Sequence, residues 1–251
     1  MRFLILSDIH ANWEALQAVL RHVRRKRFDR VAFLGDAVGY GASPNAVLNW
    51  LRGLGPTTAI VRGNHDRVCS GLDNGDYFNR YAREASSWTL DRLEDRNLEF
   101  LRSFPEGPLE IAPGAAICHG SSFDEDAYIF SVYDAQQAFA TLPHQVTFFG
   151  HTHVPTLFSL QSEHGQRSIR ARLLDGPRAV IDIDDDARYL INPGSVGQPR
   201  DRDPRAAYAI YDDDNRRVYL YRVRYAVTAA RRRIVQAGLP PVLGDRLLHG
   251  A

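Results

Sequence analysis

The sequence contains little cysteine: 251 residues include only Cys69 and Cys118. Two thiols cannot form the disulfide framework of a small secreted protein, so we expect a reducing, cytoplasmic setting. No apolar run reaches the roughly 20 residues that a membrane-spanning helix needs. The first residues, from Met1 to Asp8, lead into an apolar strand and lack the cleavage site of a signal peptide. We therefore expect neither secretion nor a membrane partner.

An excess of charge of either sign is also missing. Lys and Arg total 31 against 30 Asp and Glu, which gives a net charge of +1. Without a basic balance, a nucleic-acid partner is not expected. The arginine-rich runs at 24–27 and 231–233 are interpreted as solvated helix faces. The hydrophobic fraction of 44% and charged fraction of 24% are those of a globular protein.

Apolar segments of strand and helix length alternate at the start of the chain. They predict strands at 2–7, 31–34 and 57–61. Between them we expect a helix at 11–25 with Asn12 as its cap and a helix at 44–52 that begins at Pro44. This order favours a parallel sheet covered by helices. Further along we expect two helices within 77–104, broken near 95–97, a hairpin at 109–118 turning at Pro113-Gly114, a helix near 133–141 and a strand at 145–149. Strands and turns follow over 154–223, with a hairpin at 212–215, and the last 25 residues are helical with a break at Pro240-Pro241.

No linker or repeat divides the chain, so one domain over 1–251 is predicted. Its class is α/β, becoming α+β toward the C-terminus. A helical segment at 71–104 is expected to form a rim over the site, and residues 206–251 to form a hairpin–helix extension.

Side chains able to bind metal follow five of the predicted strands. They are Asp8, His10, Asp36, Asn64, His65, His119, His151 and His153. Ligands of open α/β sheets bind at the carboxyl ends of the strands, so these side chains should converge there. Mixed carboxylate and imidazole ligands suit Mn, Fe, Zn or Ni better than Mg or Ca. Two divalent ions are predicted, with Mn favoured; an Asp can bridge them and an Asn carbonyl can complete a coordination shell.

The ordered strings around these residues resemble the motif blocks of the calcineurin-like metallophosphoesterases. They are Asp8-Ile9-His10, Gly35-Asp36, Gly63-Asn64-His65-Asp66, Cys118-His119-Gly120 and Gly150-His151-Thr152-His153. The string 192–197, NPGSVG, is similar to a loop of the small prokaryotic phosphodiesterase branch. The resemblance extends from residue 2 to about residue 200.

This resemblance implies a four-layer α/β/β/α sandwich of two mixed sheets flanked by helices. It implies that Asp8, His10 and His153 hold one metal, that Asn64, His119 and His151 hold the other, and that Asp36 bridges them. It also implies in-line attack on phosphorus by a metal-bridging hydroxide. His65 matches the general acid of the family, which protonates the leaving oxygen.

One departure bears on the activity. Phosphoprotein phosphatases and diadenosine tetraphosphatases of this superfamily carry a second Asp and an Arg-Gly after the bridging Asp, whereas here the segment reads Asp36-Ala37-Val38-Gly39-Tyr40-Gly41. We therefore expect a metal-dependent phosphoric ester hydrolase acting on small phosphodiesters or nucleotides, and next on phosphomonoesters. Nucleoside polyphosphate or phosphoprotein hydrolysis is the alternative, and a non-catalytic scaffold of the same fold is a further one. A homo-oligomer is compatible with the sequence.

Several other residues are candidates for the surroundings of the site. Arg62, Arg200 or Arg202 could replace the missing arginine, although a structural ion pair is favoured for each. Asp66 is expected to cap the segment that follows rather than to orient His65. The aromatic residues Tyr40, Tyr77, Phe123 and Tyr128 are candidate pocket walls. The acidic cluster Asp124-Glu125-Asp126 is expected to repel highly charged polyphosphates.

Overall fold

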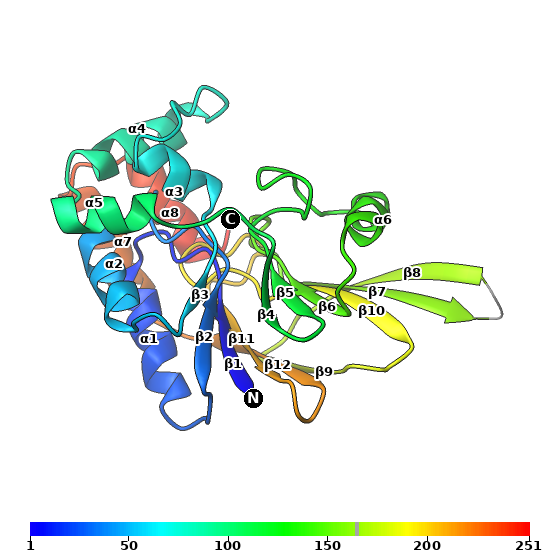
Figure 1. The fold of residues 1–251 in the computed structure, drawn as a ribbon. Helices are drawn as coiled ribbons and strands as arrows, with labels where there is room; N and C mark the ends of the chain where they lie inside the picture. Colours follow the sequence, from blue (N-terminus) through cyan, green and yellow to red (C-terminus); the bar gives the residue numbers. More distant parts are fainter. Residues whose placement is uncertain (164–165) are drawn as a thin grey trace.

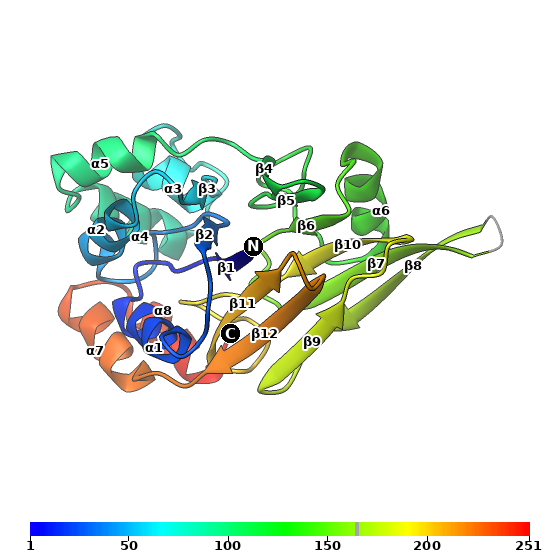
Figure 2. The same ribbon diagram turned by 60° about the horizontal axis from the view of Figure 1, so that its bottom comes forward.

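Two six-stranded mixed sheets pack face to face in the computed structural model, which describes residues 1–163 and 166–251. Several helices cover the outer face of the first sheet and one helix lies on that of the second, so the molecule has four layers (Figures 1 and 2). This arrangement confirms the predicted α/β/β/α sandwich. Within the described residues, no helix combines the length and apolar character required to cross a bilayer.

The first sheet has the order β3-β2-β1-β11-β12-β9. Its strands are β1 (Arg2–Leu6), β2 (Arg30–Phe33), β3 (Ala59–Ile60), β9 (Arg178–Asp182), β11 (Ala206–Asp212) and β12 (Arg217–Val223). The strands β1, β2 and β3 are parallel, as the alternating pattern at the start of the chain predicts. The strands β11 and β12 form the predicted antiparallel hairpin, and β11 pairs antiparallel with β1.

The second sheet has the order β4-β5-β6-β10-β7-β8. Its strands are β4 (Leu109–Ala112), β5 (Ala115–Ile117), β6 (Val146–Phe148), β7 (Thr156–Glu163), β8 (Gln166–Leu173) and β10 (Ala187–Asn192). The central strands β5, β6 and β10 are parallel. The carboxyl ends of β5 and β6 therefore reach the same edge of the second sheet.

Strand alternation sends successive side chains of β1 into two different cores. Phe3 and Ile5 lie in the core between the two sheets. Leu4 and Leu6 lie in the core between the first sheet and its helices. Because both faces of β1 are buried, its sequence is a continuous apolar run without polar alternation.

The helices are α1 (Trp13–Val23), α2 (Pro44–Gly53), α3 (Asn64–Cys69), α4 (Arg80–Leu90), α5 (Asp95–Arg102), α6 (Val132–Thr141), α7 (Val227–Gln236) and α8 (Pro241–His249). Asn12 caps α1 through its side chain, and Pro44 opens α2, both as predicted. The helix α6 packs on the outer face of the second sheet (Figure 1). The helices α4, α7 and α8 share a separate apolar cluster beside the site.

Three details differ from the sequence prediction. The strand expected at 57–61 is only the two residues of β3. The break expected near 95–97 lies instead at 91–94, between α4 and α5. The short helix α3 was not predicted, because its six residues are too few to show apolar periodicity. This helix begins at one predicted ligand, Asn64, and carries His65.

Candidate metal centre

The seven predicted metal ligands are all buried, and the segments that carry them follow strands of both sheets. Five of them have a left-handed backbone with φ between 48° and 63°: Asp8, His10, Asp36, His151 and His153. This conformation is unfavourable for residues other than glycine and is concentrated at functional sites. The fold therefore holds these loops in a strained shape that aims the side chains at one place.

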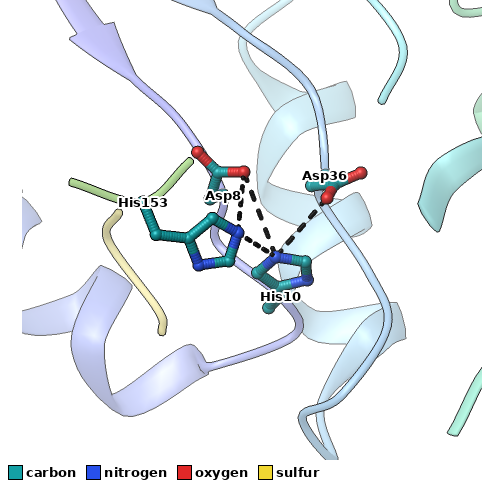
Figure 3. Close-up of side chains that lie close together, drawn as sticks. All are labelled: Asp8, His10, Asp36 and His153. Carbon is teal, nitrogen blue, oxygen red and sulfur yellow. Dashed lines mark hydrogen bonds and ion pairs between the residues drawn. The ribbon is translucent and has the colours of Figure 1, made fainter. Parts of the chain in front are cut away.

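Asp8, His10, Asp36 and His153 form the first group able to hold a metal ion (Figure 3). His153 Nε2 lies 3.2 Å from Asp8 Oδ1 and 3.2 Å from His10 Nε2. His10 Nε2 lies 3.4 Å from Asp36 Oδ2. Their ligand atoms all lie within 4.8 Å of one another.

Asp36, His119 and His151 form the second group. His119 Nε2 lies 3.5 Å from Asp36 Oδ2 and 3.2 Å from the amide oxygen of Asn64. Asp36 is thus shared by both groups, and Asn64 lies beside the second. All seven predicted ligands are brought together.

The hydrogen bonds of three histidines determine which ring nitrogen is free to bind metal. The Nδ1 atoms of His10, His119 and His153 lie 3.0, 2.8 and 2.6 Å from backbone carbonyl oxygens, which can only accept a hydrogen bond. Each Nδ1 therefore carries the proton, and in the neutral ring each Nε2 offers a lone pair. These lone pairs point at one another and at Asp8 Oδ1 and Asp36 Oδ2, two buried oxygens without a hydrogen-bond donor in the described chain. A cation placed between them satisfies these lone pairs and oxygens, so the donor set fits divalent ions.

Burial and neighbouring charges shift the pKa values of these groups. Burial raises the pKa of Asp36 well above its ordinary value, and the charge of Asp8 raises it further. Burial opposes the ionisation of Asp8 too, but His153, His119 and the hydrogen bond from Ser7 together outweigh it and lower the pKa of Asp8. Burial and the charge of His153 lower the pKa of His10. A neutral imidazole is the form that binds metal, so the low pKa favours binding.

His65 lies next to the two groups, in α3. Its backbone N–H donates to Asp36 Oδ1 at 2.9 Å. Its ring contacts the rings of Tyr40 and Phe78, with centroids 4.4 Å away in each case. Its Nδ1 has no hydrogen-bond partner in the part of the chain that is described. Burial and the charge of Arg200 lower the pKa of His65.

Asp66 does not orient the His65 ring. Its carboxylate accepts hydrogen bonds from the backbone N–H groups of Gly63 at the start of α3 and of Asp36, Ala37 and Val38 after β2. The expected capping role is therefore present, together with a brace to the loop of Asp36. Burial and the charge of Asp36 raise the pKa of Asp66 to about 7.

A cavity of about 200 Å³ opens over the two groups. Its walls include three of the four aromatic residues predicted for this role, Tyr40, Tyr77 and Tyr128, but Phe123 is not among them. Tyr128 stacks on His151 with centroids 3.9 Å apart. Phe78 also lines the cavity and was not singled out in the sequence, where nothing distinguishes it from the other apolar residues of 71–104.

The acidic cluster at 124–126 is not a free negative patch, which corrects the expectation that it repels polyphosphates. Glu125 is buried and accepts hydrogen bonds from both Arg62 and Arg67. Arg67 also donates to Asp126 at 2.6 Å. Arg62 is thus engaged in ion pairs, as predicted. Two carboxylates of the cluster, Glu125 and Asp126, are thus paired with arginines that precede them in the chain by about 60 residues.

Comparisons with known proteins agree with this site. Residues 1–216 match the family model of the calcineurin-like phosphoesterase superfamily domain. The chain is 36% identical over 254 residues to an uncharacterized protein from Methanocaldococcus jannaschii, covering 98% of this chain and 97% of that protein. It is 38% identical to a metallophosphoesterase of known structure from Sphaerobacter thermophilus, with a TM-score of 0.86 over 100% of this chain and 99% of the other. A symmetrical bis(5'-nucleosyl)-tetraphosphatase from Psychromonas ingrahamii is 30% identical over 106 residues, which is 42% of this chain and 38% of that enzyme. The protein therefore belongs to the calcineurin-like phosphoesterase superfamily and is a phosphoester hydrolase.

Proposed function

We propose that this protein hydrolyses small phosphodiesters or nucleotides in the cytoplasm, with two divalent transition-metal ions, Mn favoured, as cofactors. Asp8, His10 and His153 would hold one ion, Asn64, His119 and His151 the other, and Asp36 would bridge them. The strongest support comes from Asp36, whose Oδ2 lies within 3.5 Å of a histidine of each group. Ions bound there would supply an activated water and neutralise charge on the phosphoryl group.

His65 is the proposed general acid. It lines the cavity together with Asp36, Asn64 and His151, so a phosphoester placed over the ligand groups would have its leaving oxygen beside this imidazole. Protonation of that oxygen removes the cost of expelling an alkoxide. The aromatic walls Tyr77 and Tyr128 offer a surface for a nucleobase or an aryl group.

Nucleoside polyphosphate hydrolysis is the second candidate. The pairing of Glu125 and Asp126 with arginines removes an electrostatic obstacle to a polyphosphate chain. The similarity to a symmetrical bis(5'-nucleosyl)-tetraphosphatase over part of the chain points the same way. The segment after Asp36, which lacks the second Asp and the Arg-Gly, argues for the simpler ester substrates.

The test uses metal-stripped protein reloaded with Mn and assayed on bis-p-nitrophenyl phosphate, p-nitrophenyl phosphate and a dinucleoside polyphosphate. Faster hydrolysis of the diester, with loss of most of the rate in His65→Ala, is the expected result. His249→Ala, which changes an exposed histidine outside the site, is the matched control. A preference for the monoester or the polyphosphate would replace the proposed substrate class. Activity that survives in His65→Ala on every ester would remove the proposed role of His65.

A further inference from the structure

Arg200 reaches the cavity from the loop between β10 and β11. This loop also supplies the carbonyl oxygen of Gln198, to which His153 Nδ1 donates at 2.6 Å. The side chain of the same Gln198 accepts two hydrogen bonds from Arg200, at 2.8 Å from Nη2 and 3.3 Å from Nε. Gln198 is itself buried. One residue therefore fixes both a predicted metal ligand and the guanidinium.

The partners of Arg200 are neutral. Besides the amide of Gln198, its guanidinium lies over the ring of Tyr40, 5.8 Å from the centroid. No ion pair with a carboxylate is found for it among residues 1–163 and 166–251, whereas Arg62 and Arg67 each have at least two. The sequence favoured a structural ion pair for both Arg62 and Arg200. Within the described residues Arg62 forms such ion pairs and Arg200 does not.

The position of Arg200 relative to the reacting groups follows from Tyr40. The Tyr40 ring lies 4.4 Å from the His65 ring and 4.8 Å from the His10 ring, between centroids. Arg200 covers the same ring and lines the same cavity as Asp36, His65 and His153. It is therefore a cation on the wall of the space in which a substrate phosphoryl group would lie.

Within the described residues no carboxylate forms an ion pair with Arg200, although Asp36 and Asp126 line the same cavity. Guanidinium groups bind phosphate oxygens in a forked geometry that a lysine cannot reproduce. A guanidinium held by neutral partners keeps its remaining N–H donors available for such an anion.

We propose that Arg200 is the phosphate-anchoring residue of this site, donating hydrogen bonds to a non-bridging oxygen of the substrate. The ligand is the oxyanion of a phosphoester or phosphoanhydride, held while its phosphoryl group lies over the metal ligands. Arg200 takes the role of the arginine that is missing from the segment after Asp36. This inference rests on the proposed function, because it assigns a substrate contact in the same cavity.

The test compares wild type, Arg200→Gln and Arg200→Lys as full-length, Mn-loaded protein. Arg202→Gln is the matched control, since Arg202 lies two residues further along and is exposed. Loss of charge-assisted hydrogen bonds in Arg200→Gln should raise KM, and the inhibition constant of inorganic phosphate, by about 10- to 100-fold. The decrease in kcat should be smaller, the bound manganese unchanged, and Arg200→Lys intermediate.

Two substrates identify which oxyanion is held. An equal loss on bis-p-nitrophenyl phosphate and on a nucleoside diphosphate places Arg200 at the reacting phosphoryl group. A loss on the diphosphate alone places it at the neighbouring phosphate. Either pattern supports the assignment.

The opposite results are equally distinct. If Arg200→Gln and Arg202→Gln have the same KM and the same inhibition by phosphate, the inference is overturned, while the proposed function stays intact. Loss of bound manganese from Arg200→Gln would assign it a structural role and would also overturn it. If wild type hydrolysed none of the esters, the proposed function would fail separately. Calorimetric titration of Mn-loaded wild type and Arg200→Gln with inorganic phosphate would then decide, because weaker binding in the variant supports the anchor and equal binding rejects it.

Discussion

The ring of His65 packs against the ring of Phe78, with centroids 4.4 Å apart and planes inclined by 34°. Tyr40 contacts the same imidazole at 4.4 Å, while its Nδ1 has no hydrogen-bond partner within the described residues. Two aromatic rings thus pack against the imidazole of the proposed general acid. Phe78 lies just before α4, in the segment that lines the cavity.

Removing this contact should impair proton donation more than binding. In Phe78→Ala we expect kcat for an alkyl phosphodiester, whose alkoxide is a poor leaving group, to fall about tenfold. A misplaced acid loses part of the 10²–10⁴-fold rate enhancement that general acid catalysis supplies. Hydrolysis of bis-p-nitrophenyl phosphate should change little, because nitrophenolate leaves without a proton. Steady-state kinetics on both esters measure the difference. Phe123→Ala, outside the cavity, is the control, and equal losses on the two esters would contradict a positioning role.

Asp66 should matter for stability and for metal affinity together. All four of its partners are backbone N–H donors. In Asp66→Asn the side-chain NH₂ group, itself a donor, would therefore face some of these N–H groups. We expect a loss of about 2–3 kcal/mol in the free energy of unfolding and at least tenfold weaker Mn binding. Urea denaturation and metal titration measure these. Asp134→Asn, which changes a partly exposed capping-box residue of α6, should cost no more than about 1 kcal/mol and leave Mn affinity unchanged; equal effects would contradict the brace.

The positions of the ligands could be predicted from sequence because they depend on local order. Each lies directly after an apolar run, and parallel strands end at a common edge. Asp8 after β1 and Asp36 after β2 illustrate this. The predicted helix α1, with Asn12 as its cap, was equally local.

Three of the four aromatic walls could also be predicted, but the contacts around the ligands could not, because they join distant segments. The sequence shows Asp124-Glu125-Asp126 as three adjacent negative charges, and only the fold places Arg62 and Arg67 against them. Phe78 and Arg200 lie far apart in the chain, and the fold places both of them on the wall of the cavity. The assignment of individual ligands to each metal, and of one domain to residues 1–251, stays a prediction.

Without ions, Asp36 should destabilise the protein. Burial and the charge of Asp8 raise the pKa of Asp36, so the metal-free folded state resists its ionisation and loses stability as pH rises through that value. Asp36→Asn keeps an acceptor for the His65 N–H and removes the charge. We expect the metal-free variant to be more stable than metal-free wild type by about 1–2 kcal/mol at pH 7.

Saturating Mn should reverse that order. It should raise the melting temperature of wild type by several degrees, because the ions bind only the folded state, and it should leave Asp36→Asn almost unchanged. Calorimetric scans with and without Mn measure both effects. Asp91→Asn, an exposed substitution, should behave as wild type. If metal-free Asp36→Asn is less stable than metal-free wild type, the carboxylate stabilises the fold even without ions.

The ion pairs of Glu125 should make stability depend on pH in the acid range. Burial alone would raise the pKa of Glu125, but hydrogen bonds from Arg62 and Arg67 outweigh it and lower that pKa. The folded state therefore binds a proton less readily than the unfolded state. The resulting stabilisation is complete above the unfolded pKa of 4.5 and is lost as pH falls through the lower folded value.

Glu125→Gln should consequently lower the free energy of unfolding by about 1–3 kcal/mol at pH 7, and the difference from wild type should shrink below about pH 4. The same change should raise KM, because Asp126, next to Glu125, accepts a hydrogen bond from His151 Nε2 through its backbone oxygen at 3.0 Å. Urea denaturation at several pH values measures the first effect. Glu84→Gln, exposed on α4, provides the control. A destabilisation that stays constant down to pH 3 would mean that Glu125 acts through packing rather than through its charge.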